Sequence, residues 1–199
     1  MGSPGQTGAY TQIDLSAGFV GPLYYYSDAS AGMGYNDLPQ WHLIFRQTNP
    51  YRWSSTVSPA TNSLNENDPS NDNYSIINTM HLTTNYKNGD HYHFKYIDKT
   101  NNQTVEWKQT SNFVDTSENI TGYELIGTIN AVDNPVPNGF AGIAGSSTTR
   151  TYYDGNPGSN DWFYAIAQID DKFDIPTFSS TWSTQIELWA YAPLPSAIP

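Results

Sequence analysis

Short runs of alternating apolar and polar residues recur along the chain, and clusters of Gly, Pro, Asn and Asp separate them. An alternation with a period of two sends successive side chains to opposite faces, as in a half-buried β-strand. Turn-forming residues at the boundaries support the same interpretation. The pattern predicts strands over residues 10–15, 21–26, 41–48, 75–83, 91–97, 104–109, 123–130, 150–154, 162–169 and 183–191.

The third of these strands has the clearest alternation. Regular pleating would place Trp41, Leu43 and Phe45 on one face, and polar residues follow them toward the end of the strand. Because these are large apolar side chains, we expect this face to be buried and both aromatic rings to belong to the core.

Three other local signals refine the pattern. In the last strand, Ile186 and Leu188 should point one way and Glu187 the other. Residues 87–90 carry an Asn-Gly pair, which is typical of a tight hairpin turn. Residues 73–85 also fit a short helix, because their apolar residues recur at helical spacing.

About ten short strands separated by turns predict an all-β fold. The expected architecture is a two-sheet β-sandwich, jelly-roll-like, with at most one short helix. A length of 199 residues suits one large β domain, and no low-complexity linker divides it. We therefore expect a single domain over residues 10–199. Residues 1–9 are expected to be disordered, as an expression-tag remnant or a boundary cut from a longer protein.

The charge balance narrows the classes of partner. The formal net charge is −11, from 19 acidic and 8 basic residues, so the surface should repel nucleic acid and anionic membranes. No run of apolar residues is long enough to cross a membrane, so no insertion is expected. Few lysines and many Tyr, Thr and Asn residues favour a secreted or cell-surface protein. The chain has no cysteine, which argues against a disulfide-dense module.

The densest polar segment spans residues 65–73 and offers hard oxygen donors from Asn67, Asp68, Asn71 and Asp72. Calcium takes several such oxygens from carboxylates, amides and carbonyls. The glycine and the final glutamate of an EF-hand are missing, so this is not that motif. Two hypotheses stay open: a calcium site, with calcium as the one expected cofactor, and a loop in which Asp and Asn side chains cap backbone amides.

Catalytic signatures are lacking. The chain has neither the Gly-x-Ser-x-Gly motif nor a cysteine nucleophile. Glu106, Glu124 and Glu187 each lie in a predicted strand, and two of them would have to meet across a cleft to hydrolyse a glycoside. His91 and His93 share a strand face as a candidate zinc pair, but no third ligand is evident. We therefore expect no enzyme activity.

Aromatic and basic residues near two strand ends form the candidate ligand-binding set. Sugar rings stack on aromatic faces and peptides use the same kind of surface, whereas many Tyr and Trp residues of β proteins pack in the core instead. The candidates are Tyr51, Arg52 and Trp53 in one segment, and Arg150, Tyr152 and Tyr153 in the other.

A set of spaced motifs covers about residues 41–190: LIFRQT, NDPSNDNYSI, EWKQTSN, NDWFYAI and QIELW, in that order. This set resembles an extracellular module of secreted or adhesin-like multidomain proteins from marine invertebrates and microbes. The resemblance implies no catalytic role. Members of that family often carry cysteines, which this chain lacks, and their absence is compatible with a microbial adhesin.

These observations favour a non-catalytic, lectin-like recognition or adhesion module, stabilised by calcium and belonging to a larger multidomain protein. Its expected ligand is a glycan or a peptide on another cell or matrix. One alternative is a structural matrix protein that self-associates through its strands. The other is a polysaccharide-degrading enzyme.

Overall fold

The computed structural model describes one compact unit of the chain, which lies within residues 38–199. The described residues are 40–54, 56–80, 86–114, 119–130, 140–146, 149–156, 163–170, 174–177 and 182–192. The predictions for the first 39 residues, namely the strands at 10–15 and 21–26 and the terminal segment, lie outside these ranges.

Strands dominate the described residues, which confirms the all-β prediction. The elements are β1 (Gln40–Thr48), β2 (Tyr74–Ser75), α1 (Ile77–Met80), β3 (Lys87–Asn88), β4 (His91–Asp98), β5 (Gln103–Gln109), β6 (Glu124–Ile129), β7 (Ala144–Gly145), β8 (Thr151–Asp154), β9 (Ile166–Gln168), β10 (Ile175–Pro176), β11 (Trp182–Ser183) and β12 (Gln185–Ala192). The helix is a single turn inside residues 73–85, the segment whose apolar spacing also fits a short helix.

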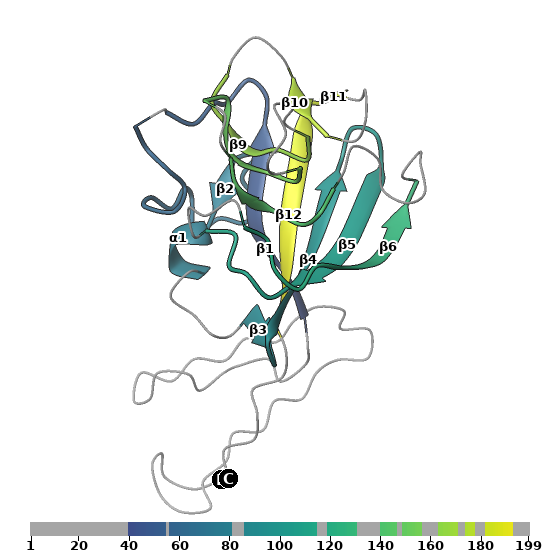
Figure 1. Ribbon diagram of the computed structural model, residues 1–199. Coiled ribbons are helices and arrows are strands. Elements are labelled where there is room, and N and C mark those ends of the chain that lie inside the picture. The colour runs from purple at the N-terminus through teal and green to yellow at the C-terminus, as the bar shows by residue number, and fades with distance from the viewer. Residues whose placement is uncertain are drawn as a thin grey trace, which may run out of the picture. The chain divides into compact units, whose positions relative to one another are not determined.

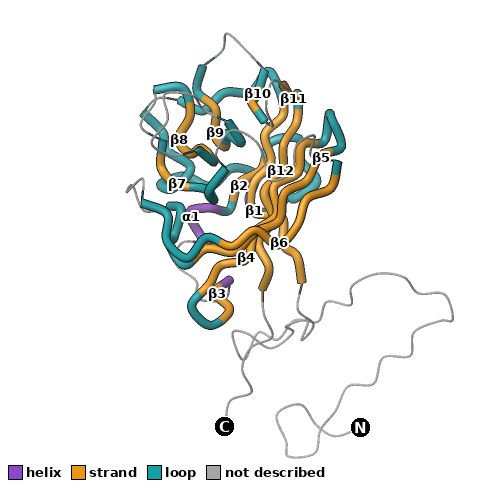
Figure 2. Tube along the Cα trace, turned by 45° about the vertical axis from the view of Figure 1, so that its right-hand side comes forward, coloured by secondary structure: helices purple, strands orange, loops and turns teal. Residues whose placement is uncertain are grey.

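The strands form one large antiparallel sheet and two small ones. The large sheet has seven strands in the order β2-β1-β12-β4-β5-β6, with β3 added beside β4. A three-stranded sheet, β7-β8-β9, and the pair β10-β11 lie on one side of it (Figures 1 and 2). The result is a two-layer arrangement consistent with a β-sandwich.

One hydrophobic core fills the space between the layers. Trp107 of the large sheet meets Phe140 edge to face, with ring centroids 5.0 Å apart. Tyr96 meets Tyr164 in the same way at 6.0 Å. The Tyr96 hydroxyl also donates a hydrogen bond to the carbonyl oxygen of Ala165 at 3.2 Å. Aromatic side chains of this kind bury large areas and favour such edge-on geometry.

Buried amide side chains join the layers as well. Gln109 in β5 accepts a hydrogen bond from the backbone N–H of Ile143 at 3.0 Å and donates one to the carbonyl oxygen of the same residue, also at 3.0 Å. Gln47 in β1 accepts a hydrogen bond from the backbone N–H of Gln168 at 3.0 Å. Each glutamine side chain therefore hydrogen-bonds to the backbone of the second layer, as the backbone of a neighbouring strand would.

A β-bulge in β1 changes which face its residues occupy. Leu43 lies opposite Trp189 in β12, whereas Phe45 lies opposite Leu188, and the register shifts between them. Because Trp189 and Leu188 are adjacent in their strand, they point to opposite faces of the sheet. Leu43 and Phe45 therefore point to opposite faces too, and the extra residue of the bulge absorbs the difference.

The prediction that Trp41, Leu43 and Phe45 share one buried face is consequently wrong. Ile44 and Phe45 are both fully buried in the core between the layers. Trp41 pairs with Tyr191 on the other face and is only half-buried. Strict alternation failed because the bulge inserts one residue, which the sequence pattern does not reveal.

Other local predictions agree with the structure more closely. The tight hairpin after residue 86 forms, with Gly89 at a positive φ of 61° in the turn between β3 and β4. The short strands β3, β7, β10 and β11 were not predicted, because strands of two residues carry no periodicity. Among the described residues no helix has the length and apolar character needed to cross a membrane.

The two faces of β1 should respond differently to truncation. We expect Phe45→Ala to lower the free energy of unfolding by about 3–5 kcal/mol, because it empties a filled core position. Trp41→Ala should cost only about 1–2 kcal/mol, since it removes half-exposed ring and cation contacts. Chemical denaturation of both variants measures the difference, and equal losses would contradict the assignment of faces.

Candidate functional site

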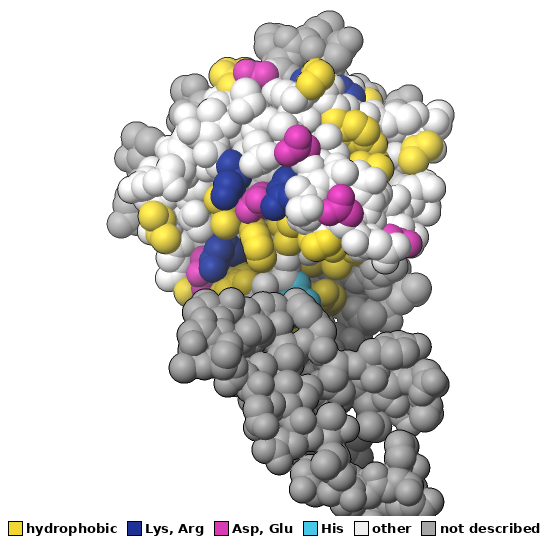
Figure 3. Space-filling model, turned by 180° about the vertical axis from the view of Figure 1, so that it is seen from behind, with side chains coloured by type: hydrophobic (Ala, Val, Ile, Leu, Met, Phe, Trp, Pro, Cys, Tyr) yellow, Lys and Arg dark blue, Asp and Glu magenta, His cyan; other side chains and the backbone are white. Residues whose placement is uncertain are grey.

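The solvent-facing side of the seven-stranded sheet, which we call the outer face, carries aromatic and charged side chains in rows that cross the strands. Strand registers place Trp41 opposite Tyr191, His93 opposite Lys108, and Lys108 opposite Glu124. A ring contact of 5.4 Å between His93 and Tyr191 joins the two parts of this row. Figure 3 shows basic, acidic and hydrophobic side chains interleaved on this side of the molecule.

Three rings of this row touch one another. The centroids of Trp41 and His93 are 4.8 Å apart with an interplanar angle of 71°, and those of Trp41 and Tyr191 are 5.5 Å apart at 67°. Such edge-to-face contacts hold aromatic rings in defined orientations. All three residues are half-buried, so each keeps some surface accessible to solvent.

The Glu106 carboxylate and the Lys95 ammonium contact this ring cluster. His93 Nε2 lies 2.8 Å from Glu106 Oε1, and Lys95 Nζ lies 3.8 Å from Glu106 Oε2. The same Lys95 ammonium lies 3.8 Å from the ring centroid of Trp41, which is a cation–π distance. We call these five residues, Trp41, His93, Lys95, Glu106 and Tyr191, the aromatic–ionic patch.

Beside the patch lies a more deeply buried ion pair. Arg46 Nη2 is 2.8 Å from Glu187 Oε1, and Trp189 Nε1 donates to Glu187 Oε2 at 3.0 Å. Glu187 is 3% exposed, so its charge needs the arginine and the indole N–H as partners. This pair stabilises the sheet next to the patch and leaves the Glu187 carboxylate little access to a ligand.

Burial sets the protonation of the patch histidine. It lowers the pKa of His93 below the ordinary value of 6.5, and the charges of Lys108 and Lys95 act in the same direction. The hydrogen bond and charge of Glu106 oppose this effect. The imidazole is therefore neutral at neutral pH, and its Nε2 carries the proton that it donates to the carboxylate. Burial lowers the pKa of His42 too.

The three glutamates considered for glycoside hydrolysis lie apart from one another on this face. Glu106, Glu124 and Glu187 all lie on the outer face, but the registers place them in three different rows. They do not form a facing pair across a cleft, as glycoside hydrolysis needs. Among the described residues no three His, Cys, Asp or Glu side chains are grouped to hold a metal, and His91 and His93 gain no third ligand there.

The structure brings the two predicted ligand-binding segments together. Arg52 Nε donates to the carbonyl oxygen of Asp170 at 2.7 Å, and Arg150 Nε lies 3.6 Å from the carboxylate of the same residue. The Tyr152 hydroxyl donates to the carbonyl oxygen of Ser54 at 2.7 Å. These contacts fasten neighbouring loops to one another.

Two residues of this set are core residues, which corrects the expectation that they face a ligand. Trp53 and Tyr153 are each 4% exposed. Trp53 stacks on Phe45 with centroids 6.0 Å apart, and Tyr51 packs edge-on against Trp53 at 5.8 Å. Burial raises the pKa of Tyr153 to about 12. The Tyr153 ring packs edge-on against Phe113, with centroids 5.3 Å apart.

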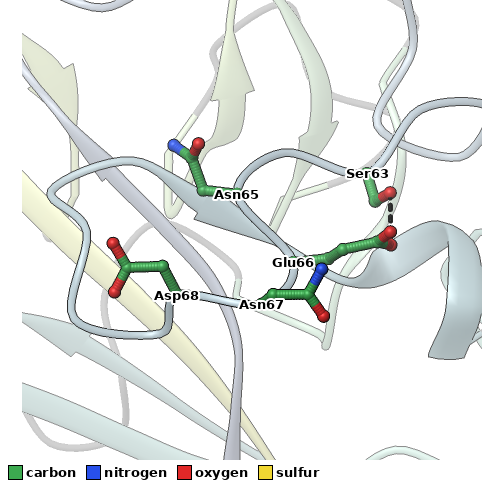
Figure 4. Close-up of a pocket in the computed structure, with 5 residues that line it drawn as sticks. All are labelled: Ser63, Asn65, Glu66, Asn67 and Asp68. Carbon is green, nitrogen blue, oxygen red and sulfur yellow. Dashed lines mark hydrogen bonds between the residues drawn. The ribbon is translucent and has the colours of Figure 1, made fainter.

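The polar segment of residues 65–73, which we call the acidic loop, borders an open hollow. Its lining residues are Ser63, Asn65, Glu66, Asn67 and Asp68 (Figure 4). The Glu66 carboxylate points toward Ser63, whose hydroxyl donates to it at 2.6 Å, and the Asp68 carboxylate points the opposite way. Asp68 Oδ1 accepts hydrogen bonds from the backbone N–H and the hydroxyl of Ser70. These bonds lower the pKa of Asp68.

The remaining predicted calcium ligands are also placed by the structure. The carbonyl oxygen of Asn71 accepts a hydrogen bond from Arg46 Nη1 at 2.9 Å, and that of Asp72 accepts one from the Thr48 hydroxyl at 2.7 Å. The side chain of Asn67 is exposed. A guanidinium therefore already occupies the inner side of the loop, as the capped-turn hypothesis would allow. Calcium binding stays a prediction.

The chain was compared with protein-family models, with curated proteins and with solved structures, and none of the three comparisons gives a match. The resemblance to an extracellular adhesin-like module thus stays an expectation.

The sequence pattern did not identify the patch as a site. By sequence, His93 is a zinc candidate and Glu106 a separate catalytic candidate, and the alternation predicts Trp41 in the core. Lys95 and Tyr191 carried no signal of their own. The only usable sign was that His93 and Lys95 share a strand face, since their partners lie on strands whose pairing the sequence does not reveal.

The half-buried histidines should make stability depend on pH. Because the pKa values of His42 and His93 lie below 6.5 in the folded state, the unfolded chain binds more protons as the pH falls past 6.5. We expect unfolding to become easier from neutral pH down to the lowered pKa values. Denaturant melts of the His42→Gln/His93→Gln double variant should show a flatter pH dependence in that window. His91→Gln is the matched control, and an unchanged slope in the double variant would contradict the assignment.

The calcium hypothesis makes a separate prediction. A cation bound only by the folded loop stabilises by about 2.7 kcal/mol at a hundredfold excess over Kd. Tm should then rise by several degrees in millimolar calcium relative to chelator, and the Asp68→Asn/Asp72→Asn variant should lose this rise. Sodium at matched ionic strength controls for screening. If sodium reproduces the shift, or the variant keeps it, the loop is only a hydrogen-bonded turn.

Proposed function

We propose that this domain is a non-catalytic recognition module that binds a glycan at the aromatic–ionic patch. The single observation that carries the proposal is the joining of three half-buried rings to a lysine and a carboxylate on a solvent-facing sheet. Groups held in this way need little ordering when a ligand arrives, which favours binding.

The composition of the patch suits a sugar. The accessible parts of Trp41 and Tyr191 offer apolar ring surface for the C–H face of a pyranose. Lys95 donates hydrogen bonds and the Glu106 carboxylate accepts them, so hydroxyl groups find both kinds of partner within one small area. Ligand sites commonly combine aromatic walls with a few fixed polar groups in this way.

A second candidate function rests on a different feature. In the described part of the sheet β6 is an end strand, and its Ile126 and Ile129 are 42% and 61% exposed. An exposed apolar edge strand can pair with another chain. This supports the alternative of a self-assembling matrix protein, and sedimentation over a concentration series would reveal it as concentration-dependent association.

We further propose that the domain works outside the cell, secreted or at a cell surface, as an adhesive part of a larger multidomain protein. Its low content of charged residues, 14%, and its 15 tyrosines support this setting. Its ligand would then be a glycan of another cell or of a matrix. The net charge of −11 speaks against nucleic acid as a partner.

The test is a glycan array followed by calorimetry on the best ligand. We expect Trp41→Ala and Tyr191→Ala each to weaken binding by about tenfold or more, as loss of an aromatic anchor does. Trp182→Ala is the matched control, because Trp182 is 45% exposed and lies in β11, outside the large sheet. Melting curves show whether each variant is folded.

Two results would contradict the proposal. One is undiminished binding by both patch variants. The other is release of reducing sugar from the bound glycan, which would identify an enzyme.

A further inference from the structure

Lys108 lies at the border of the aromatic–ionic patch and differs from the other basic residues near it. It stands in β5 between His93 of β4 and Glu124 of β6. Its side chain is half-buried. No ion pair found among the described residues involves Lys108. Among the described residues, therefore, no anion lies within ion-pair distance of its ammonium.

The acids around Lys108 do not compensate its charge. Both oxygens of Glu106 are taken, one by His93 and the other by Lys95. Glu124 stands opposite Lys108 on the end strand, but its side chain is exposed and no ion pair joins the two. Of the two lysines next to the rings, only Lys95 has a carboxylate of the described residues within ion-pair distance.

The charges of both lysines also act on His93. Lys108 and Lys95 both act to lower its pKa, so both ammonium groups are close enough to place a positive potential on the imidazole. A half-buried lysine without a partner keeps donors that a ligand can use. An anion would be the most favourable partner, because charge-assisted hydrogen bonds are stronger than neutral ones.

We propose that the glycan bound at the patch is acidic and that Lys108 binds its carboxylate or sulfate group. This inference rests on the proposed function of the patch. The sugar ring would lie against Trp41 and Tyr191, and the acidic substituent would reach Lys108 across the short distance set by His93. Lys95 is the second cation available to that substituent.

The net negative charge of the chain makes a preference for acidic glycans depend on local cations such as Lys108. With 19 acidic and 8 basic residues, the chain repels anions at long range. An acidic glycan can bind only where local cations outweigh this repulsion. Removing one of two such cations should therefore change the preference for acidic ligands strongly, and added salt should weaken that preference.

The experiment compares matched ligand pairs by calorimetry at low and high salt. Tetragalacturonate and its full methyl ester differ in the carboxylate charge, and dextran sulfate and dextran differ in the sulfate groups. We expect the wild-type domain to bind at least one acidic member about tenfold more tightly than its neutral counterpart. Lys108→Gln should remove this preference without affecting folding. Lys87→Gln, in β3 with its ammonium over the Tyr92 ring, is the charge-matched control.

Each result is decisive. A preference that disappears in Lys108→Gln and persists in Lys87→Gln supports the inference. Equal losses in both lysine variants would show a diffuse charge effect and overturn it. Equal affinity within both pairs, abolished by Trp41→Ala, would overturn it while keeping the proposed function. No binding of any member, together with a blank glycan array, would overturn both.

Discussion

Gln109 joins the two layers at a point where the second layer cannot complete its own backbone hydrogen bonds. The strands of that layer have only two to four residues, so few of their N–H and C=O groups pair within a sheet. Gln109 and Gln47 replace the missing pairs, and Asp98 accepts a hydrogen bond from the Thr177 hydroxyl at 2.7 Å. Buried polar groups without partners are costly, so the second layer depends on these side chains.

The second layer covers the inner face of the large sheet and leaves the outer face turned toward solvent. The inner face is filled by the core and by the glutamines. On the outer face, Arg46 and Glu187 form an ion pair at 2.8 Å, and His93 donates a hydrogen bond to the Glu106 carboxylate, also at 2.8 Å. Residues fixed by strands and by one another are better placed for recognition than residues on loops. The same side-chain contacts therefore stiffen the sheet and hold the patch residues in place.

The bulge in β1 decides the composition of both faces. By admitting one extra residue, it turns Ile44 and Phe45 into the core while Trp41 stays outside beside Tyr191. Without the bulge, a ring that completes the core and a ring that completes the patch would lie on the same side. This one local irregularity thus places an aromatic side chain on each face of the large sheet, Phe45 in the core and Trp41 in the patch.

The sequence alone determined the all-β class, the position of most long strands, the hairpin before β4 and the opposite faces of Ile186 and Glu187, because these follow from local periodicity and turn residues. Only the tertiary structure decided that Trp53 and Tyr153 are buried and that Arg46 occupies the acidic loop. The patch is likewise tertiary, since Trp41, His93, Glu106 and Tyr191 lie on four strands. Strand order and register bring them together, and these depend on long-range pairing that no local pattern encodes.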